Sequence, residues 1–278
     1  MRIDVRKTYK LFIGGQFPRS ESGRSYEITT ARGEFLAHAA CASRKDLRDA
    51  VVAARSALHG WSNATAFNRG QILYRIAEIM EGRRSQFIDE IRASEGGTEK
   101  QIATMVDSAI DLWVWYAGWC DKYATVSGAQ NPIAGPFYNF TTAEPIGVVG
   151  IIADQRSSLL GLIHAIAPVI ASGNTAVVIA HEKCPLSAIT LGEALATSDL
   201  HAGVVNILTG HVTELAPWLA SHMDIDALDI SGAPTKMIVD LKRLGADNLK
   251  RIHSFKGQSL TRILSFTEAK SVWHPIGI

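Results

Sequence analysis

The chain has 278 residues, of which 47% are hydrophobic and 20% charged, so it can bury a core and is too apolar to be disordered. Its 28 basic and 27 acidic residues nearly balance, which argues against a nucleic acid partner, because such proteins carry clustered positive charge. The longest apolar stretch, residues 159–171, contains His164 and Pro168 and is too short to span a bilayer. We therefore expect no membrane partner and a soluble, cytoplasmic protein.

The first part of the chain predicts a hairpin followed by helices. Two adjacent glycines divide residues 11–17 into two short apolar pieces, which is a signal for a tight turn. A strand is expected over residues 35–42, after which Ser43 is placed to cap a helix. Helices are expected over about residues 45–58, 68–81, 85–93 and 99–123.

The helix expected over residues 99–123 is rich in aromatic residues: Trp113, Trp115, Tyr116 and Trp119. At spacings of three and four residues, several of these rings share a helix face. They could form an aromatic binding surface or pack in a core or subunit interface. We favour packing, because aromatic rings supply a large buried area at helix contacts.

From residue 145 onward, expected strands and helices alternate strictly. The strands cover residues 147–153, 175–180, 204–210, 225–231 and 248–254, and the helices cover 159–172, 185–196, 214–221 and 234–244. Such alternation indicates βαβ units and a parallel sheet with right-handed crossovers. The predicted fold class is α/β, with a Rossmann-like sheet of five parallel strands. Within residues 125–143, Gly and Pro residues disfavour helix, and the pattern predicts a two-stranded ribbon.

Several sequence blocks follow one another along almost the whole chain: LFIGGQF (11–17), DLRDAVVAARSA (46–57), RGQILYRIAEIM (69–80), EPIGVVGII (144–152), APVIASGNTAVVIAHEKCPLSA (167–188), GVVNILTG (203–210) and DISG (229–232). Together and in this order, they resemble the aldehyde dehydrogenase superfamily. Residues 125–143 look like the first strands of that family's oligomerisation ribbon, and FTEAKSVWHP (266–275) looks like its last strand. The resemblance implies a Rossmann-like cofactor-binding domain over residues 1–124 and 144–254. It also implies an oligomerisation ribbon over residues 125–143 and 255–278.

The resemblance implies that no catalytic residue is present. In that family a cysteine attacks the aldehyde, an asparagine binds the oxyanion, and a glutamate acts as the base for the hydrolytic water. The family's cysteine lies in a domain inserted before the last ribbon strand, and residues 248–266 leave no room for that domain. Arg156 takes the position of the asparagine and Phe255 that of the glutamate.

The three cysteines of this chain are Cys41, Cys120 and Cys184. They are far apart and odd in number, which gives neither a disulfide framework nor a zinc spacing. Cys184 is the best remaining thiol, because it precedes an expected helix and a helix N-terminus lowers the pKa of a thiol. An ordinary packing or loop cysteine is the simpler interpretation. The nine histidines show no metal spacing, so no metal site is expected.

The cofactor site implied by the resemblance is weakened. The family's ribose-binding lysine corresponds to Ile179, whereas the glutamate three residues on is retained as Glu182. Glu182 could equally be a solvated loop acid. After the third strand Gly210 is kept, but Val212 replaces a glycine where the backbone would approach a ligand.

The start of the family's phosphate-binding helix is also altered, because Ala233 replaces a serine next to Gly232. Free backbone amides there could still attract an anion. The candidate cofactor-binding residues are Glu182, Gly210 and Gly232. We expect no cofactor to bind, although the resemblance leaves NAD or NADP open.

Three functions remain open. The favoured one is a non-catalytic structural or regulatory subunit that forms a hetero-oligomer with a full-length aldehyde dehydrogenase. In the family, the ribbon packs against the catalytic domain of a neighbouring subunit, and a chain without that domain cannot offer the same contact in return. A homo-oligomer also stays open. The alternatives are an NAD(P)-dependent aldehyde oxidoreductase with residual or altered activity, and a nucleotide or anion-binding module that uses Arg156 and the amides near Gly232.

Overall fold

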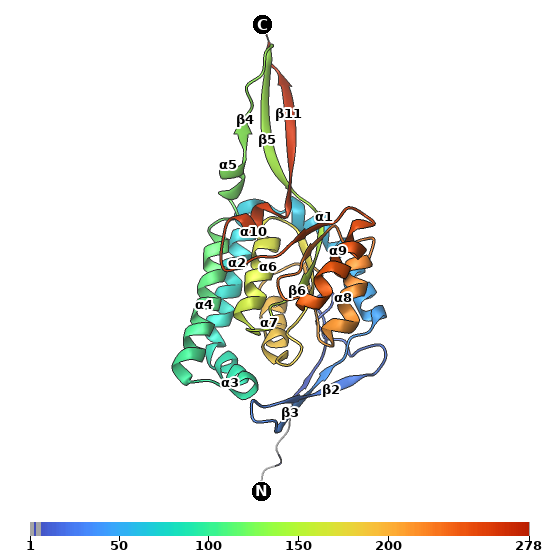
Figure 1. Ribbon diagram of the computed structural model, residues 1–278. Helices are drawn as coiled ribbons and strands as arrows, with labels where there is room; N and C mark the ends of the chain where they lie inside the picture. Colours follow the sequence, from blue (N-terminus) through green and yellow to red (C-terminus); the bar gives the residue numbers. More distant parts are fainter. Residues whose placement is uncertain (1–2, 4–6, 278) are drawn as a thin grey trace.

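Five parallel strands form the centre of the computed structural model, which describes residue 3 and residues 7–277 (Figure 1). They are β6 (Val148–Ile152), β7 (Thr175–Ile179), β8 (Val205–Leu208), β9 (Ala227–Asp229) and β10 (Arg251–His253). Their order in the sheet is β10-β9-β6-β7-β8, and every neighbouring pair is parallel. The direction of winding reverses at β6, as in doubly wound α/β folds. The predicted α/β class with a five-stranded parallel sheet is confirmed.

Different helices cover the two faces of this sheet. One face packs against α6 (Leu160–Ala171) and α7 (Leu186–Ala196), and the other against α1 (Arg44–Asn63), α8 (Val212–Ser221) and α9 (Ile238–Ala246). Val149 and Ile151 belong to the core on the α6 side, whereas Val148 and Ile152 belong to the core on the α1 side. Successive strand side chains point to opposite faces, so one apolar run fills both cores.

A further layer of helices lies outside α6 and α7, formed by α2 (Ala66–Gly82), α3 (Arg84–Glu95) and α4 (Glu99–Ala117). Trp113 and Tyr116 of α4 are completely buried, so these rings pack in the core as predicted. The helix predicted to reach residue 123 ends earlier. After Ala117 the amides of Trp119 and Cys120 bond three residues back in a tight turn, where Gly118 weakens the helix. The short helix α5 (Tyr123–Ser127) follows.

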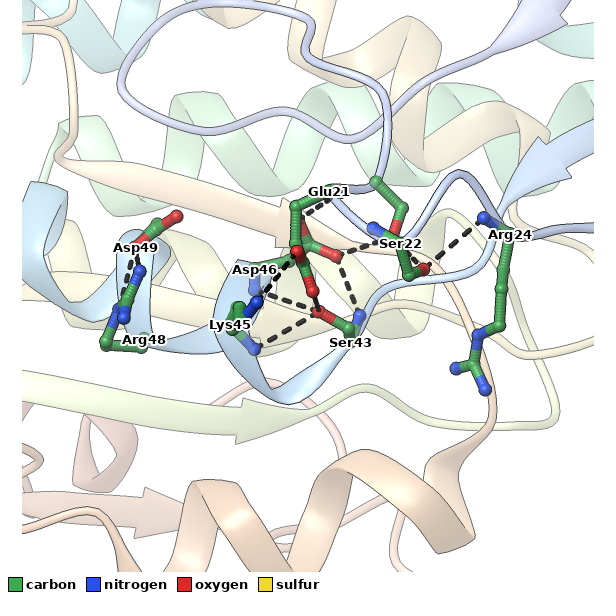
Figure 2. A network of polar contacts seen from close by, with 9 residues as sticks. Glu21, Ser22, Arg24, Ser43, Lys45, Asp46, Arg48 and Asp49 are labelled. Carbon is green, nitrogen blue, oxygen red and sulfur yellow. Dashed lines mark hydrogen bonds and ion pairs between the residues drawn. The ribbon is translucent and has the colours of Figure 1, made fainter.

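The beginning of α1 confirms the predicted cap at Ser43. The Ser43 hydroxyl accepts hydrogen bonds from the amides of Lys45 and Asp46, at 3.1 and 3.3 Å. The Asp46 carboxylate accepts from the Ser43 amide at 2.7 Å, which completes a capping box. Figure 2 shows that Glu21 joins this network, since its carboxylate accepts from the Ser43 hydroxyl and the Lys45 ammonium group. The segment before β2 is thereby tied to α1.

A small sheet near the N-terminus consists of β1 (Thr8–Tyr9), β3 (Phe35–Ala40) and β2 (Ser25–Thr29), in that order. The predicted tight turn is present, because Gly14 and Gly15 have positive φ and Ile13 and Gln16 exchange backbone hydrogen bonds. Strand β2 was missed. Within it Ile28 alone is buried, so the strand carries too little hydrophobic alternation to be recognised.

The remaining strands form an antiparallel ribbon that projects from the body of the molecule (Figure 1). It consists of β4 (Ala129–Gln130), β5 (Phe137–Pro145) and β11 (Thr267–Pro275), with β5 in the middle. The two long strands pair continuously, from Thr267 opposite Pro145 to Pro275 opposite Phe137. Within the described residues, no helix combines the length and the apolar character needed to cross a bilayer.

Candidate functional site

The three candidate cofactor residues lie at one edge of the main sheet. Glu182 follows β7, Gly210 follows β8 and Gly232 follows β9. Because the strands are parallel, their carboxyl ends share this edge, where ligands bind in open α/β sheets. The structure therefore brings the three positions to the same side of the molecule, and the contacts of each decide what it can still bind.

The carboxylate of Glu182 is engaged at the N-terminus of α8. It accepts hydrogen bonds from the Val212 amide at 2.9 Å and from Nδ1 of His211 at 3.0 Å. Burial alone would raise the pKa of Glu182, but the hydrogen bonds from His211 and Val212 outweigh burial and lower it. Glu182 thus acts as an ionised helix cap, and a ribose would have to compete with these donors.

Gly210 is needed for a close backbone approach. Its φ is 143°, and a Cβ added there would lie 3.2 Å from the amide nitrogen of Ala42. Beside it, the Tyr26 hydroxyl donates to the Glu182 carbonyl oxygen at 3.0 Å, and the Tyr26 and His211 rings are 5.5 Å apart. Tyr26 was missed by the sequence analysis because it lies on the unrecognised strand β2. Its phenol covers the loop after β7.

Gly232 also serves close packing, and its neighbourhood differs from the prediction. A Cβ at Gly232 would lie 1.8 Å from the Ala153 carbonyl oxygen. The Gly232 amide donates to the Ile152 carbonyl, and the Ala233 amide donates to the Ile230 carbonyl, both at 3.0 Å. The Gly232 and Ala233 amides are therefore not available to an anion, since both donors are used within the protein.

Arg156 is neutralised by a neighbour in its own turn. Its guanidinium donates to both carboxylate oxygens of Asp154, the shortest distance being 2.7 Å. The Arg156 side chain is 83% exposed. Asp154 also accepts from the Arg156 amide, and these contacts lower the pKa of Asp154 against the opposing effect of burial. An anion at the turn would have to displace this carboxylate from Arg156.

Phe255 lies at the position that the resemblance assigns to the general base, and its side chain makes aromatic and cation–π contacts. The ring of Phe255 stacks on that of His253 with centroids 5.6 Å apart, and the Arg262 guanidinium carbon lies 4.8 Å from the Phe255 ring centroid. The Phe255 amide donates to the Ser231 hydroxyl at 2.9 Å. Ile179, at the position of the ribose-binding lysine, is completely buried at the end of β7. Neither side chain can accept a proton or hold a hydroxyl group.

All three cysteines are free and buried. Burial raises the pKa of Cys120 to about 12 and that of Cys184 to about 11, and it also raises the pKa of Cys41. Desolvation outweighs any effect of the helix N-terminus on Cys184, which agrees with the simpler interpretation of this residue as a packing cysteine. The Cys184 thiol instead donates to the Ser94 carbonyl at 3.7 Å. Among the described residues, no group of three His, Cys, Asp or Glu side chains is arranged to hold a metal.

The junction between β10 and β11 is a packed segment rather than an open connection. It contains the short helix α10 (Thr261–Leu264), which the sequence analysis missed, and both Ile263 and Phe266 are completely buried. The Arg262 side chain is 5% exposed and reaches Asp229 at the end of β9, which has no exposed surface. The junction thus covers the carboxyl edge of the sheet beside β9.

Comparison with known proteins gives a consistent assignment. The model of the aldehyde dehydrogenase family matches residues 17–264. Retinal dehydrogenase 2 of Homo sapiens is 33% identical over 256 residues, which cover 90% of this chain and 48% of that protein. Cytosolic 10-formyltetrahydrofolate dehydrogenase of Mus musculus is 31% identical over 260 residues, which cover 90% of this chain and 28% of that protein. The chain spans about half the length, or less, of these curated relatives.

Solved structures lead to the same assignment. HpcC from Thermus thermophilus superimposes with a TM-score of 0.85 and 29% identity, over 90% of this chain and 48% of that chain. An NAD+ complex of aldehyde dehydrogenase from Bacillus cereus superimposes with a TM-score of 0.83 and 27% identity, over 88% of this chain and 50% of that chain. With sequence blocks, sheet order and relatives in agreement, the chain belongs to the aldehyde dehydrogenase family.

Proposed function

We propose that this chain is a non-catalytic member of the family that assembles, through its β4-β5-β11 ribbon, with a full-length aldehyde dehydrogenase subunit. The observation that carries the proposal is the long edge strand β11, which pairs with β5 on one side. Its other side has no strand partner among the described residues. An exposed edge of this length is a template for strand addition and favours either a partner or aggregation.

The side chains of the ribbon also suit an interface. Phe137 and Trp273 meet edge to face with ring centroids 5.9 Å apart, and their side chains are 42% and 60% exposed. Tyr138 is similarly exposed and its ring lies 5.4 Å from that of Phe140. Exposed aromatic rings on a projecting ribbon are typical of protein interfaces, where they supply large contact areas.

The surroundings of the cysteines and the residue at the position of the base support a non-catalytic role. The thiols of Cys41, Cys120 and Cys184 are buried with raised pKa values, and Phe255 stands at the position of the base. The described chain passes from β10 to β11 through residues 254–266 alone. In the family the ribbon contacts the catalytic domain of a neighbouring subunit, so a complementary partner would be a chain that has this domain.

The proposal is tested by co-expressing the tagged chain with a full-length aldehyde dehydrogenase of the same organism. We expect the two to co-purify as a complex of defined stoichiometry by native mass spectrometry. The variant Trp273→Ala should weaken the complex at least tenfold, because interface aromatics commonly contribute more than about 1.4 kcal/mol. The control Trp218→Ala, which alters a 41% exposed tryptophan on α8 away from the ribbon, should not. A well-behaved homo-oligomer that ignores every full-length partner would contradict the proposal.

A dehydrogenase with residual or altered activity is the second candidate, favoured by the likeness to a structure described as an NAD+ complex. Against it, the Glu182 carboxylate is already bound by the Val212 amide and by His211. Calorimetric titration with NAD and with NADP separates the two functions. We expect no saturable heat at millimolar coenzyme, and saturable binding would favour the second candidate.

A further inference from the structure

A small cavity lies beneath the junction, between the turn after β6 and the end of β9. Its volume is about 290 Å³. Its lining residues come from the turn after β6, from α6, from the end of β9 and from the junction, and they include Asp154, Arg156, His164, Lys256 and Arg262. Such a volume accommodates a small ion with a few waters and is too small for a dinucleotide.

The charges around the cavity leave a surplus of positive charge. Asp154 and Arg156 neutralise one another at 2.7 Å, and Asp229 lies 3.4 Å from Arg262. Lys256 is exposed and has no hydrogen bond or carboxylate partner among the described residues, although it lines the cavity. One ammonium group therefore remains available to an anion.

Arg262 offers further donors from a buried position. Its Nε donates to the Gly257 carbonyl at 2.8 Å, and its Nη1 donates to the His164 carbonyl at 2.9 Å. A guanidinium has five N–H donors, and Nη2 makes no hydrogen bond with any described residue. The side chain is 5% exposed and held on three sides, so its remaining donors are preorganised.

His164 also lines the cavity and carries a buried, unpaired polar atom. Its Nδ1 is buried and has no hydrogen-bond partner within the described chain. Burial, together with the charge of Arg262, lowers the pKa of His164 to about 4, so the ring is neutral near pH 7. A neutral imidazole can donate one hydrogen bond without adding charge.

We propose that this cavity binds a small oxyanion, of the size of phosphate or a short carboxylate, between the Arg262 guanidinium and the Lys256 ammonium group. Guanidinium and ammonium groups are the usual ligands of such anions, and a partly enclosed site strengthens each charge-assisted hydrogen bond. The cavity overlaps the site expected from the sequence at Arg156, but the donors are Arg262 and Lys256 in place of Arg156 and the amides near Gly232. It goes beyond the proposed assembly and does not depend on it.

The test is thermal unfolding and calorimetry of the whole chain with inorganic phosphate and, separately, with malonate, at ionic strength held constant with chloride. We expect a saturable rise in melting temperature with at least one of the two. Stabilisation by phosphate alone would identify a phosphoryl ligand, and stabilisation by malonate alone a carboxylate; both results support the site. A shift that merely tracks ionic strength, or none at all, would overturn it.

Two variants locate the binding. Lys256→Ala removes an exposed side chain and should weaken binding about tenfold or more, as expected for loss of a charge-assisted hydrogen bond. Arg262→Lys keeps the charge but loses the fork of donors, and it should also bind more weakly if it folds. The matched control Lys100→Ala removes an exposed lysine at the start of α4, outside the cavity, and should bind like the native chain. Native affinity in Lys256→Ala would overturn the proposed site even if Arg262→Lys fails to fold.

Discussion

The Arg262 guanidinium lies 3.4 Å from the Asp229 carboxylate, and the two side chains are 5% and 0% exposed. This contact joins α10 in the junction to the end of β9. Asp229 also accepts hydrogen bonds from the amide and the hydroxyl of Ser231. Burial raises the pKa of Asp229, while Ser231 and Arg262 oppose that effect. The junction is therefore held by a polar contact inside the protein as well as by apolar packing.

We predict that Arg262→Ala lowers the free energy of unfolding by about 3 kcal/mol, because it leaves a buried carboxylate without its cation. Urea denaturation followed by tryptophan fluorescence measures the loss. Arg75→Ala is the control, since Arg75 forms an exposed pair with Glu78 at 3.4 Å and should change stability by about 0.5 kcal/mol or less. Equal losses in the two variants would show that the buried contact stabilises no more than a surface pair.

Gly232 should tolerate no side chain. A Cβ would lie 1.8 Å from the Ala153 carbonyl oxygen, so Gly232→Ala must displace backbone and should cost about 2–3 kcal/mol. Gly82 in α2 offers a matched control, because a Cβ there meets nothing within 4 Å. Gly82→Ala should be neutral or slightly stabilising, since alanine favours helix. The melting temperatures of Gly232→Ala and Gly82→Ala test this prediction. Similar values for the two variants would contradict the packing role of Gly232.

Glu182→Ala tests the capping role of this carboxylate. The loss of its hydrogen bond to the Val212 amide should lower stability by about 1 kcal/mol near neutral pH. The pKa of Glu182 is lowered on folding, so its contribution is present above the unfolded pKa of about 4.5 and is lost as the pH falls. The difference between native and variant should therefore shrink on acidification, which unfolding curves at several pH values would show.

If Glu182 were instead a free ribose ligand, the same variant would keep its stability and lose affinity for coenzyme. Glu78→Ala, which removes an exposed acid of α2, controls for the general effect of charge. A loss of stability that does not depend on pH would count against the cap.

The thiols should react only when the protein unfolds. With a pKa of about 11, Cys184 is about one part in a thousand ionised near pH 8, and all three thiols are buried. Treatment of the native chain with a thiol-specific disulfide reagent should label none of them rapidly, whereas in denaturant all three should react. Rapid labelling of one thiol in the native chain would reveal an activated cysteine.

Much of the architecture could be predicted from local patterns. Apolar runs of strand length alternated with helical segments, and Ser43 marked the start of a helix. These signals involve residues that are close together in the chain, so they can be recognised in a single sequence. Strand β2 and helix α10 carried no such signal, because their burial comes from contacts with remote parts of the chain.

In the candidate site, too, the sequence indicated which residues matter, and the structure decided which of their groups are free. The resemblance brought Glu182, Gly210 and Gly232 to notice, and the parallel sheet places all three at its carboxyl edge. Whether their groups remain free depended on partners that are distant in sequence. Glu182 is bound by Val212, 30 residues away, and its carbonyl by Tyr26, 156 residues away.

The sequence by itself determined the α/β class, the parallel sheet and the family, because hydrophobic periodicity and ordered motifs are properties of short segments. The tertiary structure alone decided that burial raises the pKa of the three thiols, that the amides at Gly232 and Ala233 are used, and that Arg262 is buried at the junction. Desolvation and hydrogen-bond satisfaction depend on which remote groups surround an atom, and Arg262 meets partners 33 and 98 residues away. No local sequence pattern predicts such long-range contacts.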